Sequence, residues 1–217
     1  MNKTYTVRRV FAEELEKIEK MYTQFDFLHF NPYKRDFLEE ILLCGHIWAA
    51  YDGDDMAACS CIFPGDMAGW CSTAAKWNAE ELLDIQGINY AVAGYTACKE
   101  KIADGEITAL FCRLWQSVAL KRNIEKVLYL HTAHIHTDMG QILSAGFRLA
   151  GLRGLDRLVP HYIFIRETNV KNHSEEKATE IKKCPPADTK EISRLCEQGF
   201  YGYDTDAEGN IIFTCRR

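Results

Sequence analysis

One helix with a continuous apolar face, set between apolar strands, constrains this chain more than any other feature. Its apolar side chains recur at the spacing of a buried helix face: Ile107, Leu110, Phe111, Leu114 and Val118. Residues 121–123 supply the charge and turn chemistry of a helix C-terminus. Apolar residues 127–131 and 162–165 predict buried strands. Residues 88–166 therefore form the main body of a mixed helix-and-strand fold.

Two glycines mark helix ends in this region. Gly105 lies in the loop between the strand that starts near residue 88 and the long helix. Free backbone N–H groups and the helix dipole make such a loop a natural site for an anion. Gly146 follows a short helix and suits a left-handed C-cap.

The N-terminal half has an equally regular pattern. Residues 4–10 alternate like a strand, and residues 11–25 and 33–43 have the apolar spacing of helices. Two further strands, 46–51 and 56–63, flank an Asp-Gly turn, which predicts a hairpin.

The C-terminal quarter changes character. Residues 168–188 are polar, charged and contain two prolines, so they predict a linker or an exposed crossing segment. Residues 189–217 predict a helix followed by a hairpin, too short to fold alone. We therefore expect a main domain over 1–167 with this extension packed on it.

Composition excludes several classes of protein. The net charge of −5 argues against general nucleic-acid binding, and no apolar run reaches the roughly 20 residues that span a bilayer. Residues 1–10 do not resemble a signal sequence. The nine cysteines contain no Cys-x-x-Cys pair, which favours buried free thiols in a reducing cytoplasm. A metal pair at Cys59 and Cys61 is the alternative, although no second pair matches it.

The order of elements, together with segments 123–132 and 145–151, resembles the GNAT superfamily of N-acetyltransferases. The resemblance spans roughly residues 4–166. It implies an α+β fold in which a mixed central sheet is flanked by helices. It also implies that the strands ending near Ala97 and beginning near Val127 are parallel neighbours that splay apart to form a cofactor cleft.

The resemblance implies acetyl-CoA as co-substrate, held by the fourth strand and the following loop, with no metal. The pattern R/Q-x-x-G-x-G/A of that loop falls on 102–107, where only Gly105 matches and two acidic residues add negative charge. The phosphate site is therefore either retained with help from nearby lysines or lost. The cofactor-binding residues expected are Tyr95, Thr96, Ala97, Lys101, Ala103, Asp104, Gly105, Glu106 and Ile107.

The tyrosine that the family often uses as general acid is replaced by Ile142. The catalytic candidates are therefore His134, His136, Tyr95 and Tyr162. His131, His134 and His136 form a cluster that could bind a metal, but a polar loop with His131 directed into the sheet is the simpler interpretation. Asp138, placed before a helix, is expected to be its cap.

The leading hypothesis is an acyl-CoA-dependent N-acyltransferase that acetylates an amine on a small molecule or peptide. The alternatives are a catalytically inactive binding or regulatory module with the same fold, and an acyltransferase with a donor other than CoA. We expect no nucleic-acid or membrane partner, and a homodimer is left open.

Overall fold

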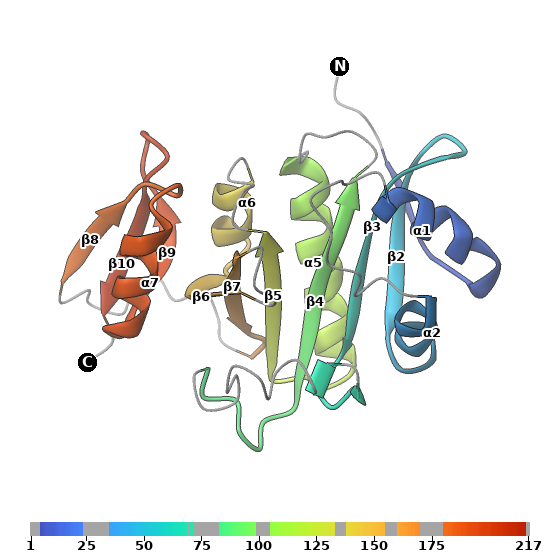
Figure 1. Cartoon of the computed structure of the whole chain (residues 1–217), viewed down its shortest axis with the longest axis horizontal. Coiled ribbons are helices and arrows are strands. Elements are labelled where there is room, and N and C mark those ends of the chain that lie inside the picture. Colours follow the sequence, from blue (N-terminus) through green and yellow to red (C-terminus); the bar gives the residue numbers. More distant parts are fainter. Residues whose placement is uncertain are drawn as a thin grey trace.

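A computed structural model describes residues 5–23, 35–68, 70–71, 83–98, 105–132, 138–154, 160–169 and 180–215. Ten strands form one mixed sheet in the order β1-β2-β3-β4-β5-β7-β6-β9-β10-β8 (Figure 1). The strands are β1 (Thr6–Arg9), β2 (His46–Asp52), β3 (Asp55–Pro64), β4 (Tyr90–Cys98), β5 (Lys126–Thr132), β6 (Arg148–Gly154), β7 (Pro160–Glu167), β8 (Ile181–Cys184), β9 (Phe200–Thr205) and β10 (Ile211–Cys215).

Helices pack on both faces of this sheet. They are η1 (Ala12–Glu14), α1 (Leu15–Thr23), α2 (Arg35–Cys44), α5 (Gly105–Lys121), α6 (Met139–Ser144) and α7 (Thr189–Glu197). Alternate residues of a strand point to opposite faces. Accordingly, Leu128 and Leu130 of β5 lie in the core under α1 and α2, whereas Val127 and Tyr129 lie in the core under α5 and α6. None of the helices in the described ranges is both long and apolar enough to cross a bilayer.

The central strands confirm the predicted arrangement. β4 and β5 pair in parallel from Tyr90↔Lys126 to Gly94↔Leu130. Beyond that point each strand continues with its other neighbour, β4 with β3 as far as Cys98 and β5 with β7 as far as Thr132. Figure 1 shows the two strands diverging toward their carboxyl ends. The parallel pair is therefore split, as expected.

Two strands were not expected from the sequence. β6 contains two glycines and an alanine, residues with low strand propensity, and it owes its conformation to pairing with β7. β8 lies inside the segment predicted as a linker, so that prediction is wrong for residues 181–184. Its short, lysine-rich sequence carries little strand signal, and its pairing with β10 decides its conformation.

The C-terminal unit, comprising residues 180–215, contains the predicted helix and hairpin together with β8. Its backbone meets the main sheet at one residue pair, Leu149↔Gly202. Its core is nevertheless continuous with the core under α5 and α6, because Ile192, Leu195 and Phe213 belong to the same buried cluster. The unit therefore shares its buried core with the main body.

A carboxylate in the β9–β10 turn gives a first testable prediction. Asp206 accepts hydrogen bonds from the backbone N–H groups of Glu208 and Asn210 and pairs with Lys183 at 3.0 Å. The Lys183 bond is the largest cause that lowers the pKa of Asp206 to about 2. Because the folded pKa is depressed, this stabilisation is present above about pH 4 and is lost as the pH falls toward 2.

We expect Lys183→Met to raise the pKa of Asp206, measured by carbon-13 chemical-shift titration of its carboxyl group. Lys190→Met, on the exposed surface of α7, is the matched control that leaves it unchanged. An unaltered Asp206 titration in Lys183→Met would contradict the ion pair.

Candidate functional site

The candidate site lies where β4 and β5 part. The last pair, Gly94↔Leu130, is unusually close: a Cβ on Gly94 would lie 2.8 Å from the carbonyl oxygen of Leu130. The φ of Gly94 is 128°, a conformation that side chains other than glycine rarely adopt. Glycine is therefore required at the point where the strands separate.

A β-bulge in β4 follows directly. Cys59 pairs with Ala97 and Cys61 with Gly94, so Tyr95 and Thr96 together stand opposite Ser60. The buried Ser60 hydroxyl donates to the Gly94 carbonyl at 3.0 Å and lies 2.9 Å from the Thr96 hydroxyl. A bulge bends its strand and re-aims its side chains. Ser60 thus fixes the local shape of β4 at the split.

A chain of polar side chains lies on the α5 and α6 face of this region. The Tyr129 hydroxyl is 3.0 Å from Nδ1 of His131, and Nε2 of His131 is 3.0 Å from Oδ1 of Asp138. The Thr108 hydroxyl, in the first turns of α5, donates to Oδ2 of Asp138 at 2.8 Å. The chain therefore links β5, α5 and the residue that precedes α6.

Burial sets the charges of these groups. Burial opposes ionisation of Asp138, but the hydrogen bonds from His131 and Thr108 outweigh it and lower the pKa of the carboxyl. Burial raises the pKa of Tyr129 well above its ordinary value, so the phenol stays protonated at neutral pH. Asp138 stands at the N-cap position of α6, as expected, but its side chain makes no capping bond there.

The start of α5 lies close to α6. A Cβ on Gly105 would lie 2.6 Å from the side-chain nitrogen of Gln141, which is exposed and flexible. Glu106 is exposed in the first turn, whereas Ile107 is buried and faces the core. Ile107 can therefore offer a ligand only its backbone. Lys101, Ala103 and Asp104 lie outside the described residues.

The fold recurs in known structures. No protein-family model and no curated sequence matches the chain. An N-acetyltransferase from Staphylococcus aureus matches it with a TM-score of 0.55 at 9% identity, over 76% of this chain and 98% of that chain. Arabidopsis thaliana NAA60 in complex with acetyl-CoA matches with a TM-score of 0.53 at 15% identity, over 77% and 100%. The chain has the fold of the GNAT acetyltransferases.

A third match reaches further along the chain. FeeM, an N-acyl amino acid synthase from uncultured soil microbes, has a TM-score of 0.53 at 12% identity and covers 91% of this chain and 99% of that chain. Residues 180–215 make up about a sixth of the sequence. A match over 91% must therefore include part of the C-terminal unit, so the likeness to a GNAT fold extends into it.

The GNAT fold separates the predicted catalytic residues. Tyr162 is fully buried on β7, on the far side of β5 from β4, and its hydroxyl donates to the carbonyl of Pro186. The prediction that Tyr162 lines the cleft is therefore wrong. Tyr95 lies in the bulge at the split. His134 and His136 lie outside the described residues.

Sequence reasoning missed most of the polar chain at the split, namely Ser60, Thr108, Tyr129 and the role of Asp138. One signal was available, because Tyr129 and His131 stand two residues apart in an apolar strand and therefore share a face. Within the described residues, no group of three or more His, Cys, Asp and Glu side chains is arranged to hold a metal. Cys59 and Cys61 are fully buried free thiols, and burial raises the pKa of Cys59 to about 12.

A basic pocket of about 490 Å³ lies between α5 and α6 of the GNAT fold. Arg113 and Arg166 line it, beside Gln116 and Gln141. Arg113 is exposed, whereas Arg166 is half-buried, and this burial lowers the pKa of its guanidinium. Because Gln141 also lies beside Gly105, the pocket adjoins the start of α5. This part of the site therefore offers positive charge to an anionic ligand.

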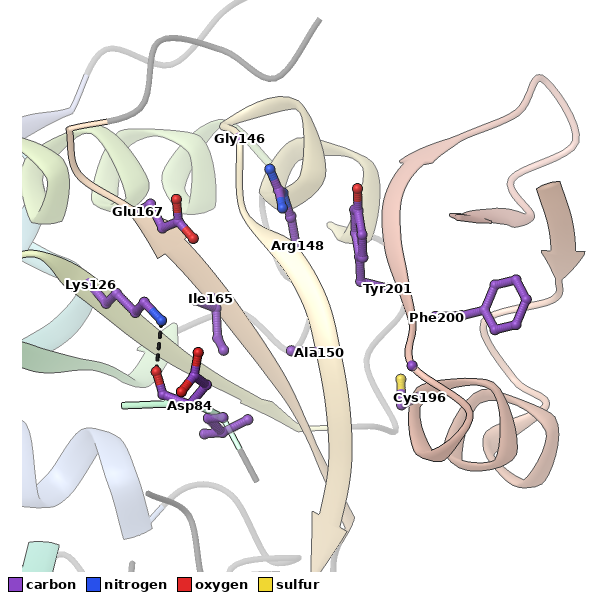
Figure 2. A pocket seen from close by; sticks show the side chains of 12 residues that line it. Asp84, Lys126, Gly146, Arg148, Ala150, Ile165, Glu167, Cys196, Phe200 and Tyr201 are labelled. Atoms are coloured by element: carbon purple, nitrogen blue, oxygen red, sulfur yellow. Dashed lines mark hydrogen bonds between the residues drawn. The ribbon is translucent and has the colours of Figure 1, made fainter. Parts of the chain in front are cut away.

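A second cavity, of about 380 Å³, lies between the main sheet and the C-terminal unit (Figure 2). Its cationic groups are already engaged: Lys126 donates to the Asp84 carbonyl at 2.8 Å, and the Arg148 guanidinium lies 4.7 Å from the ring centre of Tyr201. Lys126 begins β5, about 13 Å of strand before Leu130 at the split. The cavity is therefore distinct from the site at the split.

Proposed function

We propose that this protein is an acyl-CoA-dependent N-acyltransferase that moves an acetyl group from acetyl-CoA to an amine on a small molecule or peptide. The observation that carries the proposal is the split parallel pair β4 and β5, with the start of α5 following β4. Fold neighbours in complex with acetyl-CoA support it.

The split offers a place for a thioester. Beyond Gly94 the backbone of β4 pairs with β3 on one side, while its ladder with β5 has ended. Backbone N–H groups of residues 95–97 that point to the β5 side can then donate to the thioester carbonyl and stabilise the charge that develops on its oxygen. Holding a neutral amine against the carbonyl carbon supplies roughly 7 kcal/mol or more of the barrier reduction.

The start of α5 and the adjoining pocket suit the phosphates of the cofactor. Backbone N–H groups in the first turn of a helix point toward its N-terminus, where an anion is favoured, and Gly105, Glu106 and Ile107 form that turn of α5. Arg113 and Arg166 add positive charge in the pocket between α5 and α6. Their positive charges would offset the negative charges of Glu106 and of the acidic residue at position 104.

We expect Gly105→Val to abolish acetyl-CoA binding, measured by titration calorimetry, while the protein stays folded. The branched side chain would cover the N–H groups at the start of α5. The fold should tolerate it, because the neighbour it meets is the flexible end of the Gln141 side chain.

A matched double variant separates two causes of the loss. In Gly105→Val combined with Gln141→Ala, the clashing amide is absent. Binding that stays absent in this double variant shows that the valine itself blocks the site. Unchanged acetyl-CoA affinity in folded Gly105→Val would place the cofactor elsewhere.

The breadth of the FeeM match favours an amino acid among the acceptors, because that neighbour is an N-acyl amino acid synthase and shares part of the C-terminal unit. The test is turnover of acetyl-CoA with matched pairs of amines, each amino acid beside its decarboxylated amine. Preference for the amino acid supports this acceptor class. Tight acetyl-CoA binding without turnover of any amine would instead favour a regulatory module.

A further inference from the structure

We infer that the cavity between the main sheet and the C-terminal unit is a second binding site, for a free amino acid with an apolar side chain. Lys126, which lines this cavity, lies about 13 Å of strand before Leu130 at the split. None of the described residues that line the cavity is assigned to acetyl-CoA. The inference therefore goes beyond the proposed function and does not depend on it.

The size of the cavity is the first support. Protein interiors leave few voids larger than a water molecule. This cavity has a volume of about 380 Å³, and pockets for small molecules begin at about 300 Å³. Two units that only packed against each other would close such a space. The cavity therefore has room for a ligand of the size of an amino acid.

The arrangement of charges in the lining is the second support. Lys126 on β5 is directly opposite Glu167 on β7, and Arg148 on β6 is opposite Ile165, two residues before Glu167. Opposite residues, and residues two apart in one strand, share a face of the sheet. Glu167 therefore stands between two cations on one face, and Figure 2 shows the three side chains around Ile165. Asp84 is the fourth charged residue among the described lining residues.

Two positive and two negative side chains favour a ligand that carries both signs of charge. A ligand with only an anionic group would be repelled by Asp84 and Glu167, and one with only a cationic group by Lys126 and Arg148. A free amino acid carries a carboxylate and an ammonium on the same carbon atom. Its carboxylate can accept from Arg148 and Lys126 while its ammonium donates to Glu167.

The contacts that hold the two cations are compatible with this ligand. The Arg148 guanidinium lies 4.7 Å from the ring centre of Tyr201. This contact covers a face of the guanidinium, whereas the five N–H donors lie in its plane. Lys126 donates to the Asp84 carbonyl at 2.8 Å, and an ammonium has three donors. Neither contact therefore uses up the hydrogen-bonding capacity of the cation.

An apolar part of the lining adjoins these charges. Leu83 comes from the segment before β4, Ile165 from β7, Ala150 from β6 and Cys196 from α7. Leu83 is buried, and the other three are half-buried. Apolar walls with a few placed polar groups are typical of small-molecule sites. This part of the cavity suits a branched aliphatic side chain such as that of leucine, which would contact both the main sheet and the C-terminal unit.

Titration calorimetry of the full-length protein with L-leucine, in the absence of acetyl-CoA, tests the site. Two analogues each lack one charge of the ligand: isopentylamine has no carboxylate, and isocaproate has no ammonium. Arg148→Gln and Glu167→Gln each remove one charge of the lining. Ala150→Leu fills the cavity and removes no charge, so it tests the site even where a charge variant does not fold. The controls Arg194→Gln and Glu197→Gln change exposed residues of α7 that do not line the cavity.

We expect the wild type to bind L-leucine at least about 10-fold more tightly than either analogue, because each analogue loses hydrogen bonds between charged groups. The three cavity variants should weaken L-leucine binding by a similar factor or abolish it, and the two controls should keep the wild-type Kd. L-leucine should also slow amide hydrogen exchange in α7 and β9 of the wild type but not of Ala150→Leu. Binding should persist in Gly105→Val.

Unchanged L-leucine affinity in folded Ala150→Leu would overturn the inference, because the ligand would then bind elsewhere. Equal affinity for L-leucine and one of its analogues would also overturn it. So would the absence of binding of L-leucine, L-valine and L-methionine to the wild type at millimolar concentration. A protein that acylates amines but binds no amino acid in this cavity keeps the proposed function and loses this site. Binding in the cavity without any acylation has the opposite meaning.

Discussion

Trp115→Ala should lower the free energy of unfolding by about 3–5 kcal/mol, measured by urea denaturation. Trp115 is fully buried in α5 and lies at the centre of an aromatic cluster. Its ring centre is 4.7 Å from that of Tyr129 and 6.3 Å from those of Phe111 and Phe147. Truncation to alanine leaves a cavity that these rings, held by α5, the sheet and the segment after α6, cannot close.

The control for this prediction is Leu120→Ala on the same helix. Leu120 is 56% exposed, so its truncation should change stability by less than about 0.5 kcal/mol. Similar losses for the two variants would mean that helix propensity, rather than the aromatic core, accounts for the effect.

Gly94→Ala should lower the free energy of unfolding by about 2–6 kcal/mol in the same measurement. The φ of 128° makes a side chain strained, at about 1–3 kcal/mol. The new Cβ would also lie 2.8 Å from the Leu130 carbonyl oxygen, a backbone atom that cannot move aside, and such overpacking costs about 1–3 kcal/mol more.

The control Gly53→Ala separates the cost of backbone strain at a positive φ from the cost of the close contact between β4 and β5. Gly53 also has a positive φ, 62°, in the turn between β2 and β3, but a Cβ there would meet nothing within 4 Å. Its replacement should cost about 1–2 kcal/mol. If Gly94→Ala costs no more than Gly53→Ala, the close approach of β4 and β5 does not constrain position 94.

Local patterns in the sequence were enough to predict most of the fold. The apolar stripe of α5, the Asp-Gly turn between β2 and β3, and the glycine after α6 each predict an element that the structure contains. The strand β6 was not predicted, because its small residues carry no strand signal. Its position next to β7 depends on pairing between distant segments of the chain. β8 was missed because its short, lysine-rich sequence carries little strand signal and its conformation depends on pairing with β10.

The candidate site was less predictable, because its contacts are long-range. Asp138 has the local pattern of a helix cap, yet its partners are Thr108 and His131, brought to it by the packing of α5 and β5. The sequence around Tyr162 indicates only an aromatic side chain in a strand. Nothing nearby in the sequence indicates that its hydroxyl donates to the carbonyl of Pro186. Residue spacing cannot reveal partners that only the topology brings together.

The C-terminal unit has a consequence for self-association. β6 pairs with β7 along one side, and its other side is met by β9 at one residue pair, with α7 packed against the strand. An uncovered strand edge is a template on which a second chain can add. A protein shortened to residues 1–169 would present that edge to other copies and would remove the Pro186 carbonyl that accepts from Tyr162. The C-terminal unit thus protects the sheet against aggregation at the edge where the main body ends.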